Sequence, residues 1–443
     1  MFIFLLILLA LAIIIVAIIK FEIHPFLALF SGAIIYGLMA GMPAELIISS
    51  ITDGFGGVLG RIGLLILFGV VIGTFLEKSG GAFVIAQKVL SWVGQKSVML
   101  GMMITGYISS IPVFGDSAFI MLNPINKSLS FKGKLPYAAT TVALTLGITA
   151  THSLVPPTPG PIAAAGILDA DLGQIIFFGL ITSALGLVPC YFFCKYWVSK
   201  IHLVPVFAEI DKLGKTTKNP SLGKSFMPII IPLVLIILSS IAAYPTQPFG
   251  DNLFTSLISF IGNPIIALLL GAFMAFSLPE KLDKKVLSSS GWFGEALLIG
   301  APVILITGAG GVFGKMLQNS GIADQISSIM TAGNLSLFLP FAISFALKSA
   351  QGSSTVALVT TASIMVPLMP ALGLDTEIMR VLTVLATGAG AIAVSHANDS
   401  FFWAMTQLSG MNIKQGYQSH SLGTVILSFT AMAIIFILAT VLA

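Results

Sequence analysis

The chain runs in unbroken apolar blocks of about 20 residues each, and these blocks constrain its fold more than any other feature. A helix of that length spans the hydrocarbon core of a bilayer, whereas the strands of an outer-membrane barrel alternate apolar and polar residues. Only 9% of the 443 residues are charged, against roughly 25% in a soluble protein. The pattern predicts an all-α polytopic membrane protein. It excludes a soluble enzyme, a disordered chain, a nucleic-acid-binding protein and an outer-membrane barrel.

The apolar blocks predict membrane segments along the whole chain. They lie at 2–19, 26–42, 55–76, 98–124, 136–168, 174–198, 226–245, 262–278, 292–317, 335–370, 377–407 and 422–443. The first block has no basic residues before it and no small-residue cleavage site after it. It therefore predicts a membrane span rather than a signal peptide.

Lysine placement predicts the orientation of these segments, because basic residues favour the cytoplasmic side. Six lysines lie in Lys195–Lys224, and a second basic turn lies at Lys281–Lys285. Both turns are expected in the cytoplasm. This topology requires 98–124 and 335–370 to be re-entrant hairpins that enter and leave the membrane on one face. Both termini are then outside.

The two halves of the chain resemble each other at an offset of about 240 residues. Pro25–Ala33 matches Pro264–Ala272, and Thr151-His152 matches Ser395-His396. Because the predicted topology orients the two halves oppositely, the repeat is inverted. Inverted repeats with interrupted helices in matching positions indicate a secondary transporter.

The repeat also predicts the domain organisation. The expected order is a first repeat, a cytoplasmic loop and a second repeat, at 1–200, 201–225 and 226–443. Plain spans at 1–54 and 226–291 predict a scaffold. Breaks and hairpins are confined to 55–200 and 292–443, which predicts that these ranges form a transport part.

Four polar stretches interrupt the apolar pattern inside the membrane. They are Ser109–Ser117, Thr151–Pro161, Lys348–Thr355 and Ser395–Ser400. Backbone that leaves a helix inside a bilayer must line a cavity or be buried in protein. Helices that restart at such breaks present free N–H groups and a positive dipole end, which suit a carboxylate. The four stretches therefore predict a substrate site near the membrane midplane.

The residues of these stretches form the candidate substrate-binding set, with hydroxyl and amide groups for substrate hydroxyls and one lysine for a carboxylate. The set is Ser109, Ser110, Gly115, Asp116, Ser117, Thr151, His152, Thr158, Lys348, Ser349, Gly352, Ser353, Ser354, Ser395 and Asn398. Candidates for proton coupling are His152, His396 and Asp399, since histidine titrates near neutral pH and intramembrane charges are costly. No metal-ligand spacing and no Walker motif occurs, so no metal, cofactor or ATP hydrolysis is expected.

Structural roles compete with each of these assignments. Serine and threonine in membrane helices often bond their own carbonyl groups. The charged groups of Asp116, Asp399 and Lys348 could pair only to hold the breaks together. Sodium coupling competes with proton coupling, because unwound carbonyls around Pro156–Gly160, with Asn398 and Asp399, offer the oxygen ligands that hard cations prefer.

At these breaks the sequence resembles the gluconate permease family of proton symporters, within the ion transporter superfamily. The resemblance rests on Thr151–Pro161 followed by Asp169–Gly173, on Gly352–Ala357, on Ser395–Trp403 and on Gly314–Gly321. It departs from the gluconate members at three places. This chain has Lys348 where the gluconate members resemble a sequence with an arginine. It has Thr158 where they have a second histidine, and Phe114-Gly115-Asp116 roughly where they have a Tyr-Glu pair. Lysine does not grip a carboxylate in the bidentate fashion of arginine, so the substrate stays open among organic anions.

The resemblance implies a symporter that imports a small hydroxylated monocarboxylate with protons across the bacterial inner membrane. It also implies an elevator-type transport domain that moves against a homodimeric scaffold. Two other function classes compete, a membrane-embedded enzyme that uses His152 or His396 with Asp399, and a channel. An enzyme does not need polar breaks at matching repeat positions, and hairpins from opposite faces look more like alternating gates than a pore. A sodium-coupled symporter of organic anions or amino acids is the remaining alternative.

Overall fold

The described part of the chain consists of helices and contains no strands. The computed structural model describes residues 6, 9–10, 12–14, 16–17, 20–21, 23–93, 98–203, 219–242, 248–250, 252–320, 337–396 and 399–442. The predicted all-α class is confirmed over these residues. Most of the predicted span at 2–19 lies outside these residues, and so does Asn398.

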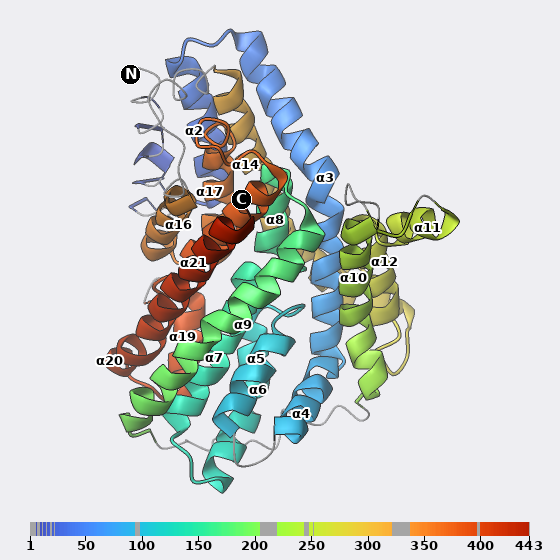
Figure 1. The fold of residues 1–443 in the computed structure, drawn as a ribbon, viewed down its shortest axis with the longest axis vertical. Coiled ribbons are helices and arrows are strands. Elements are labelled where there is room, and N and C mark those ends of the chain that lie inside the picture. Colours follow the sequence, from blue (N-terminus) through green and yellow to red (C-terminus); the bar gives the residue numbers. More distant parts are fainter. Residues whose placement is uncertain are drawn as a thin grey trace.

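The helices of the first half run from residue 25 to residue 200. They are α2 (Pro25–Met39), α3 (Ala44–Lys78), α4 (Gly81–Val93), α5 (Val98–Ser109), α6 (Gly115–Lys132), α7 (Tyr137–Leu154), α8 (Pro159–Leu168), α9 (Leu172–Tyr196) and η2 (Val198–Lys200). Figure 1 shows them in blue to green.

The helices of the second half run from residue 222 to residue 442. They are α10 (Leu222–Ala242), α11 (Leu253–Ile261), α12 (Pro264–Ala275), α13 (Lys284–Leu287), α14 (Trp292–Asn319), α16 (Phe338–Gln351), α17 (Ser354–Met365), α18 (Glu377–Ile392), α19 (Ser400–Ser409), α20 (Ile413–Gly416), η5 (Tyr417–Ser421) and α21 (Leu422–Leu442).

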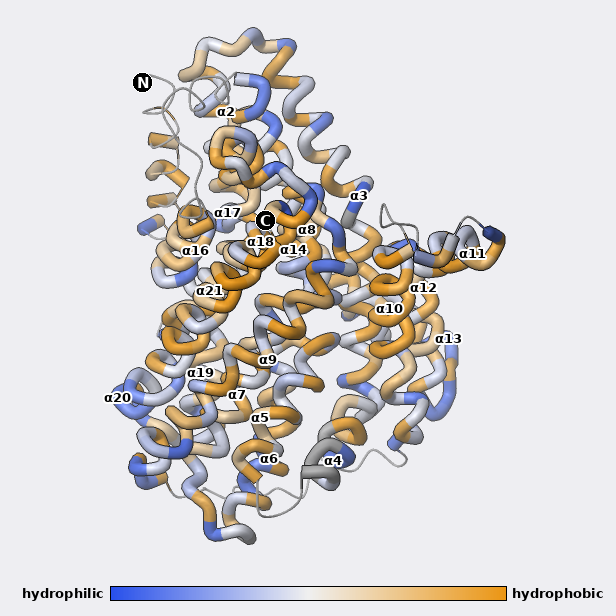
Figure 2. Tube along the Cα trace, viewed as in Figure 1, coloured by the Kyte–Doolittle hydropathy of each residue, from blue (hydrophilic) through white to orange (hydrophobic). Residues whose placement is uncertain are grey.

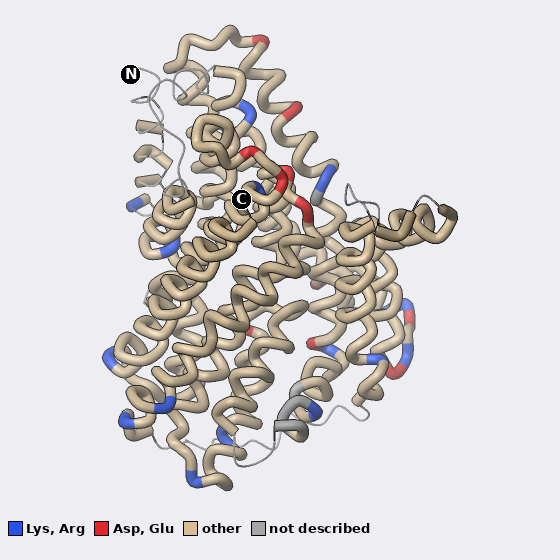
Figure 3. Tube along the Cα trace, in the orientation of Figure 1, with Lys and Arg blue, Asp and Glu red and all other residues tan. Residues whose placement is uncertain are grey.

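Long apolar helices dominate the fold, as the apolar blocks predict. Among the described residues, five helical segments are long and apolar enough to cross a membrane, or up to seven if each of two bent pairs counts as one span. One bent pair lies within α3, which turns by 44° between Arg61 and Gly63. Hydrophobic residues colour the helices along most of their length in Figure 2. In Figure 3 most of the helix length carries no charged residue, and several Lys and Arg gather at the lower end of the molecule.

The helices α3 and α14 pack along each other and form one group with α2, α10 and α12. Their backbones touch: a Cβ atom at Gly54 would lie 2.6 Å from the carbonyl oxygen of Gly311. A Cβ atom at Gly308 would lie 2.4 Å from the ring of Phe55. The glycines of α14 therefore allow the two helices to pack closely.

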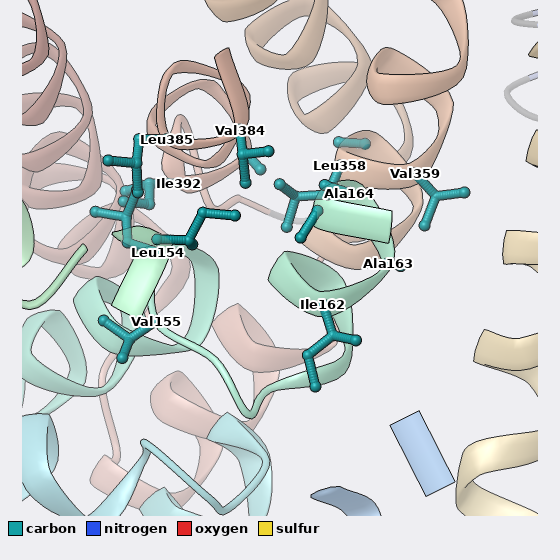
Figure 4. Close-up of a cluster of buried hydrophobic side chains, with 14 of the residues drawn as sticks. Leu154, Val155, Ile162, Ala163, Ala164, Leu358, Val359, Val384, Leu385 and Ile392 are labelled. Atoms are coloured by element: carbon teal, nitrogen blue, oxygen red, sulfur yellow. The ribbon is translucent and has the colours of Figure 1, made fainter. Parts of the chain in front are cut away.

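A second group consists of α5 to α9 with α16 to α21. An apolar cluster joins its two halves: Leu154, Val155 and Ile162 at the junction of α7 and α8 pack near Leu358 of α17 and Leu385 of α18 (Figure 4). These side chains pack the end of α7 against α18, and they pack α8 against α17.

Each of the four polar stretches falls at a junction between two helices. The helices break at 110–114, 155–158, 352–353 and 393–399. At the third break Gly352 has a φ angle of 83°, a left-handed conformation that favours glycine because it has no Cβ. Ser353 then caps α17, with its hydroxyl accepting from the Val356 N–H. The sequence places glycine and serine where the chain must turn and restart.

Candidate substrate site

A cavity of about 290 Å³ lies where three of the four breaks meet. Its lining comes from the start of α6, the last turns of α7, the break between α16 and α17, and the break between α18 and α19. The lining residues are Phe114, Gly115, Asp116, Ile148, Thr149, His152, Lys348, Gly352, Ser353, Ser354, Thr355, Ile392, Ser395, Asp399, Ser400 and Phe401. The cavity therefore combines helix starts, hydroxyl groups and ionisable side chains.

A buried ion pair lies at the centre of the cavity wall. Lys348 Nζ lies 2.7 Å from Asp399 Oδ2, and the two residues are only 3% and 8% exposed. The Lys348 ammonium also donates to the Gly352 carbonyl, which ties it to the hairpin tip. Asp399 accepts from the Ser395 hydroxyl at 2.5 Å and, through its other oxygen, from the Phe401 N–H at 3.0 Å. The aspartate thus caps α19 while it neutralises the lysine.

A second carboxylate and a histidine face the same cavity with free bonding capacity. Asp116 Oδ2 accepts from the Ser400 hydroxyl at 3.2 Å, while its Oδ1 is buried and has no partner among the described residues. His152 lies against the Phe114 ring, at 6.2 Å between centroids, and its Nδ1 also lacks a described partner. A polar group without a partner in a buried site costs free energy until a ligand satisfies it.

The charges of the cavity wall do not balance. With both aspartates ionised, one lysine faces two carboxylates, Asp116 and Asp399, and the formal charge is −1 with His152 neutral. An anion that enters this wall meets repulsion unless a cation enters with it. The described residues contain no group of three or more His, Cys, Asp or Glu side chains that could hold a metal ion.

The structure brings nine of the predicted site residues to the cavity and leaves others outside it. The residues at the cavity are Gly115, Asp116, His152, Lys348, Gly352, Ser353, Ser354, Ser395 and Asp399. The predicted residues that do not line it are Ser109, Ser110, Ser117, Thr151, Thr158, Ser349 and His396. Asn398 lies outside the described residues.

Several of the outlying residues hold the breaks in shape. Thr158 donates to the Val155 carbonyl at 2.7 Å, and Thr151 donates to the Tyr107 carbonyl at 3.0 Å, which joins α7 to α5. His396 Nε2 bonds the Ser349 carbonyl at 2.7 Å, so its ring contacts the backbone of α16. The contacts of Thr158 and Thr151 favour a structural role for these two side chains.

Five polar or aromatic lining residues were not among the predicted set. They are Phe114, Thr149, Thr355, Ser400 and Phe401. Thr149 lies one helical turn before His152 and shares its face, a spacing that could have identified it. Ser400 begins α19 directly after Asp399, so its position at a helix start was also readable. Phe401 carries no such signal, because aromatic residues are common in apolar helices.

Comparison with known proteins gives one family match over almost the whole chain. The family model described as "GntP family permease" matches residues 2–441. The chain is 33% identical to the gluconate permease of Pseudomonas aeruginosa, in an alignment that covers 97% of this chain and 95% of that protein. It is 34% identical to the inner membrane permease YgbN of Escherichia coli, over 94% of both chains, and 29% identical to the D-serine transporter DsdX of that species, over 98% of both.

Two solved structures share the fold. The YdaH transporter of Alcanivorax borkumensis matches with a TM-score of 0.66 and 12% identity, over 90% of this chain and 89% of that one. MtrF of Neisseria gonorrhoeae matches with a TM-score of 0.64 and 15% identity, over 90% of this chain and 84% of that one. At these identities the likeness concerns the arrangement of the helices alone.

Proposed function

Because the chain belongs to the GntP permease family, whose members are transporters rather than enzymes, we propose that it is a secondary active symporter for a small hydroxylated monocarboxylate and protons. The observation that carries this proposal is the unbalanced cavity wall, with one lysine facing two aspartates. Such a wall accepts an organic anion only together with a positive charge. Transport of the two species together is then a consequence of the electrostatics of the site.

The substrate class follows from the chemistry of the lining. The Lys348 ammonium and the helix starts at Gly115 and Ser354 suit a carboxylate. Hydroxyl groups of Thr149, Ser353 and Ser400 suit substrate hydroxyls. Similar proteins are named for gluconate, L-idonate and D-serine, which are all small carboxylates that bear at least one hydroxyl group. We propose a substrate of the same kind.

Proton coupling is proposed to act through the Lys348–Asp399 pair. A proton on Asp399 removes the charge that holds Lys348, so the ammonium becomes available to a substrate carboxylate. His152 faces the same cavity and is proposed as a further proton site. His396, the third proposed proton residue, contacts the Ser349 carbonyl and would act from the hairpin tip rather than from the cavity wall.

We also propose an elevator mechanism built on two inverted repeats in a homodimer of the bacterial inner membrane. The order α2–α3, α5–α6, α7–α8 and α9 recurs as α12–α14, α16–α17, α18–α19 and α21, which supports the repeat. The boundary expected after residue 54 falls inside α3, and α3 packs closely on α14. We therefore propose that α3 and α14 belong with α2 and α10 to α13 in the scaffold, while α5 to α9 and α16 to α21 move.

Uptake by purified protein in liposomes tests the function. We expect accumulation of a labelled hydroxy acid under an imposed pH gradient, acidic outside, without sodium. Gluconate, L-idonate and D-serine serve as the first substrates, and exchange of labelled for unlabelled substrate reports binding and translocation without a gradient. Accumulation that needs sodium and ignores the pH gradient would establish the sodium-coupled alternative. A channel would show no exchange-driven accumulation.

A further inference from the structure

The hydroxyl groups that line the cavity offer a ligand open acceptors rather than open donors. Four of these hydroxyls already give their hydrogen to an acceptor of the protein. The bonds run from Thr149 to the Thr145 carbonyl, from Ser354 to the Ala391 carbonyl, from Ser395 to Asp399 and from Ser400 to Asp116, at 2.5 to 3.2 Å. Each hydroxyl oxygen can still accept a hydrogen bond. This part of the wall therefore suits a ligand group that donates.

Asp116 supplies a charged acceptor that is still open. Its Oδ1 atom is buried and has no partner among the described residues, while its Oδ2 atom accepts from the Ser400 hydroxyl. A buried carboxylate oxygen without a donor is costly, and a ligand that donates to it removes that cost. An ammonium group carries three donors and no acceptor. It therefore matches this carboxylate and the hydroxyl oxygens around it.

The charge of the cavity wall favours a zwitterion over an anion. In the proposed symport a proton on Asp399 frees Lys348. The wall then holds one positive charge on Lys348 and one negative charge on Asp116, with His152 neutral. A sugar-acid anion would leave one uncompensated negative charge in this buried site, which is costly. A zwitterion leaves the loaded cavity neutral, because it brings an ammonium for Asp116 and a carboxylate for Lys348.

The charged groups follow one another along one stretch of the wall. Ser400, which donates to Asp116, comes directly after Asp399 in the chain, and Asp399 lies 2.7 Å from Lys348. All four residues line the same cavity of about 290 Å³. A 2-amino acid bears its ammonium and its carboxylate on one carbon atom, so its two charges suit recognition groups that are neighbours.

We propose that the substrate is a small hydroxylated 2-amino acid, bound as a zwitterion, and that Asp116 recognises its ammonium group. The inference rests on the proposed symport and narrows its substrate class. The substrate carboxylate binds Lys348 and the helix start at Ser354, and lining hydroxyls such as that of Thr149 accept from the substrate hydroxyl. Asp116 then determines the choice between an amino acid and a hydroxy acid.

Serine and glycerate test this assignment, because they differ only at carbon 2, which bears an ammonium in serine and a hydroxyl in glycerate. For at least one configuration, we expect the unchanged protein to bind serine about tenfold or more tightly than the matching glycerate. Such a ratio is expected for one buried hydrogen bond between charged groups. Asp116→Asn should weaken the binding of serine by about the same factor and leave glycerate bound at least as tightly as before. Calorimetric titration of the purified protein measures these affinities.

Glu77→Gln is the matched control for the loss of one negative charge. Glu77 of α3 bonds Ser117, the neighbour of Asp116, but it does not line the cavity. This variant should keep the preference for serine over glycerate.

The outcomes are distinct. Affinity for serine that is equal to or weaker than that for glycerate in the unchanged protein overturns the inference, and this comparison needs no variant. An equal loss of both ligands in Asp116→Asn also overturns it, because the carboxylate then does not distinguish an ammonium from a hydroxyl. Transport of glycerate or gluconate without serine overturns the inference and leaves the proposed symport intact. Serine that binds through Asp116 but is not accumulated under a pH gradient supports the inference and removes the proton symport instead.

Discussion

At the residue scale, the buried pair of Lys348 and Asp399 ties stability to transport. Removing one partner of a buried ion pair leaves an uncompensated charge, whereas replacing both by neutral groups is often tolerated. Asp399 also caps α19 and accepts a hydrogen bond from the Ser395 hydroxyl. An asparagine at position 399 would keep part of this hydrogen bonding. The pair can therefore be neutralised without losing every contact around it.

Replacing Lys348 by methionine should stop uptake and destabilise the protein. Methionine keeps most of the side-chain length but leaves Asp399 buried without its partner, at a cost of about 3–5 kcal/mol in the free energy of unfolding. The double change Lys348→Met with Asp399→Asn should recover much of this stability and still not transport. Thermal unfolding followed by fluorescence, with uptake in liposomes, measures both. Uptake that persists in Lys348→Met would remove this lysine from the substrate site.

Asp399→Asn alone should uncouple substrate binding from pH. In the unchanged protein, substrate affinity is expected to fall as pH rises, because fewer molecules carry the proton that releases Lys348. The asparagine is permanently neutral, so the part of the pH dependence that comes from Asp399 should disappear, and accumulation should fall while exchange continues. Asp116→Asn is the matched control, and it should bind the anion more tightly and keep the pH dependence. Calorimetric titration at several pH values decides, and a normal pH dependence in Asp399→Asn contradicts the proposal.

The sequence could reveal the charged residues of the site, because Lys348, Asp399 and Asp116 stand out in an apolar stretch. It could not reveal that Lys348 and Asp399 pair, since 51 residues separate them and only the folded helices bring them together. The contact of the His396 ring with the Ser349 carbonyl also depends on how the chain turns after α18.

At the element scale, α3 contacts two of the breaks at glycine residues, where no side chain separates the backbones. A Cβ atom at Gly73 would lie 2.2 Å from the Pro112 carbonyl oxygen, and one at Gly69 would lie 2.6 Å from that of Pro157. Real Cβ atoms do not approach backbone oxygen so closely. These two glycines therefore allow two segments to lie close to α3. The segments are the tip between α5 and α6 and the break between α7 and α8.

Gly73→Val should displace the tip at Pro112 and lower both stability and transport. The added side chain cannot fit without a shift of backbone, and such overpacking costs about 1–3 kcal/mol. Gly60→Ala is the control on the same helix, because nothing lies within 4 Å of a Cβ atom there, and alanine favours a helix over glycine. Unfolding temperature and initial uptake rate test the pair. Equal behaviour of the two variants would show that the close approach has no role.

The sequence predicted most helices but not how far each one continues. The block at 292–317 corresponds closely to α14 (Trp292–Asn319), and 98–124 falls within the pair α5 and α6. By contrast, α3 begins at Ala44 and runs across the expected boundary at residue 54. Hydropathy identifies the residues that suit lipid, whereas the ends of a helix depend on caps and on packing against other helices.

At the scale of the whole molecule, an ion cluster bridges the two groups of helices. Arg61 of α3 lies 3.3 Å from Asp169, which follows α8, and Asp169 also binds Arg380 of α18 at 3.0 Å. If α3 belongs to the scaffold while α8 and α18 move, the Arg61–Asp169 contact must open during transport. The Asp169–Arg380 contact lies within the moving part and must persist.

Cross-linking these two contacts should therefore give opposite results. Arg61→Cys with Asp169→Cys, joined by a short thiol-reactive linker, should block uptake, and the same linker between Asp169→Cys and Arg380→Cys should not. Both pairs share the change at Asp169, and the loss of partly exposed ion pairs costs at most about 1 kcal/mol each, so folding is matched. Native Cys190 and Cys194 are buried, which directs the reagent to the introduced thiols. Uptake by liposomes before and after linking measures the effect. Undiminished uptake across the Arg61 link would show that α3 and α8 move together, and the scaffold boundary along α3 would be wrong.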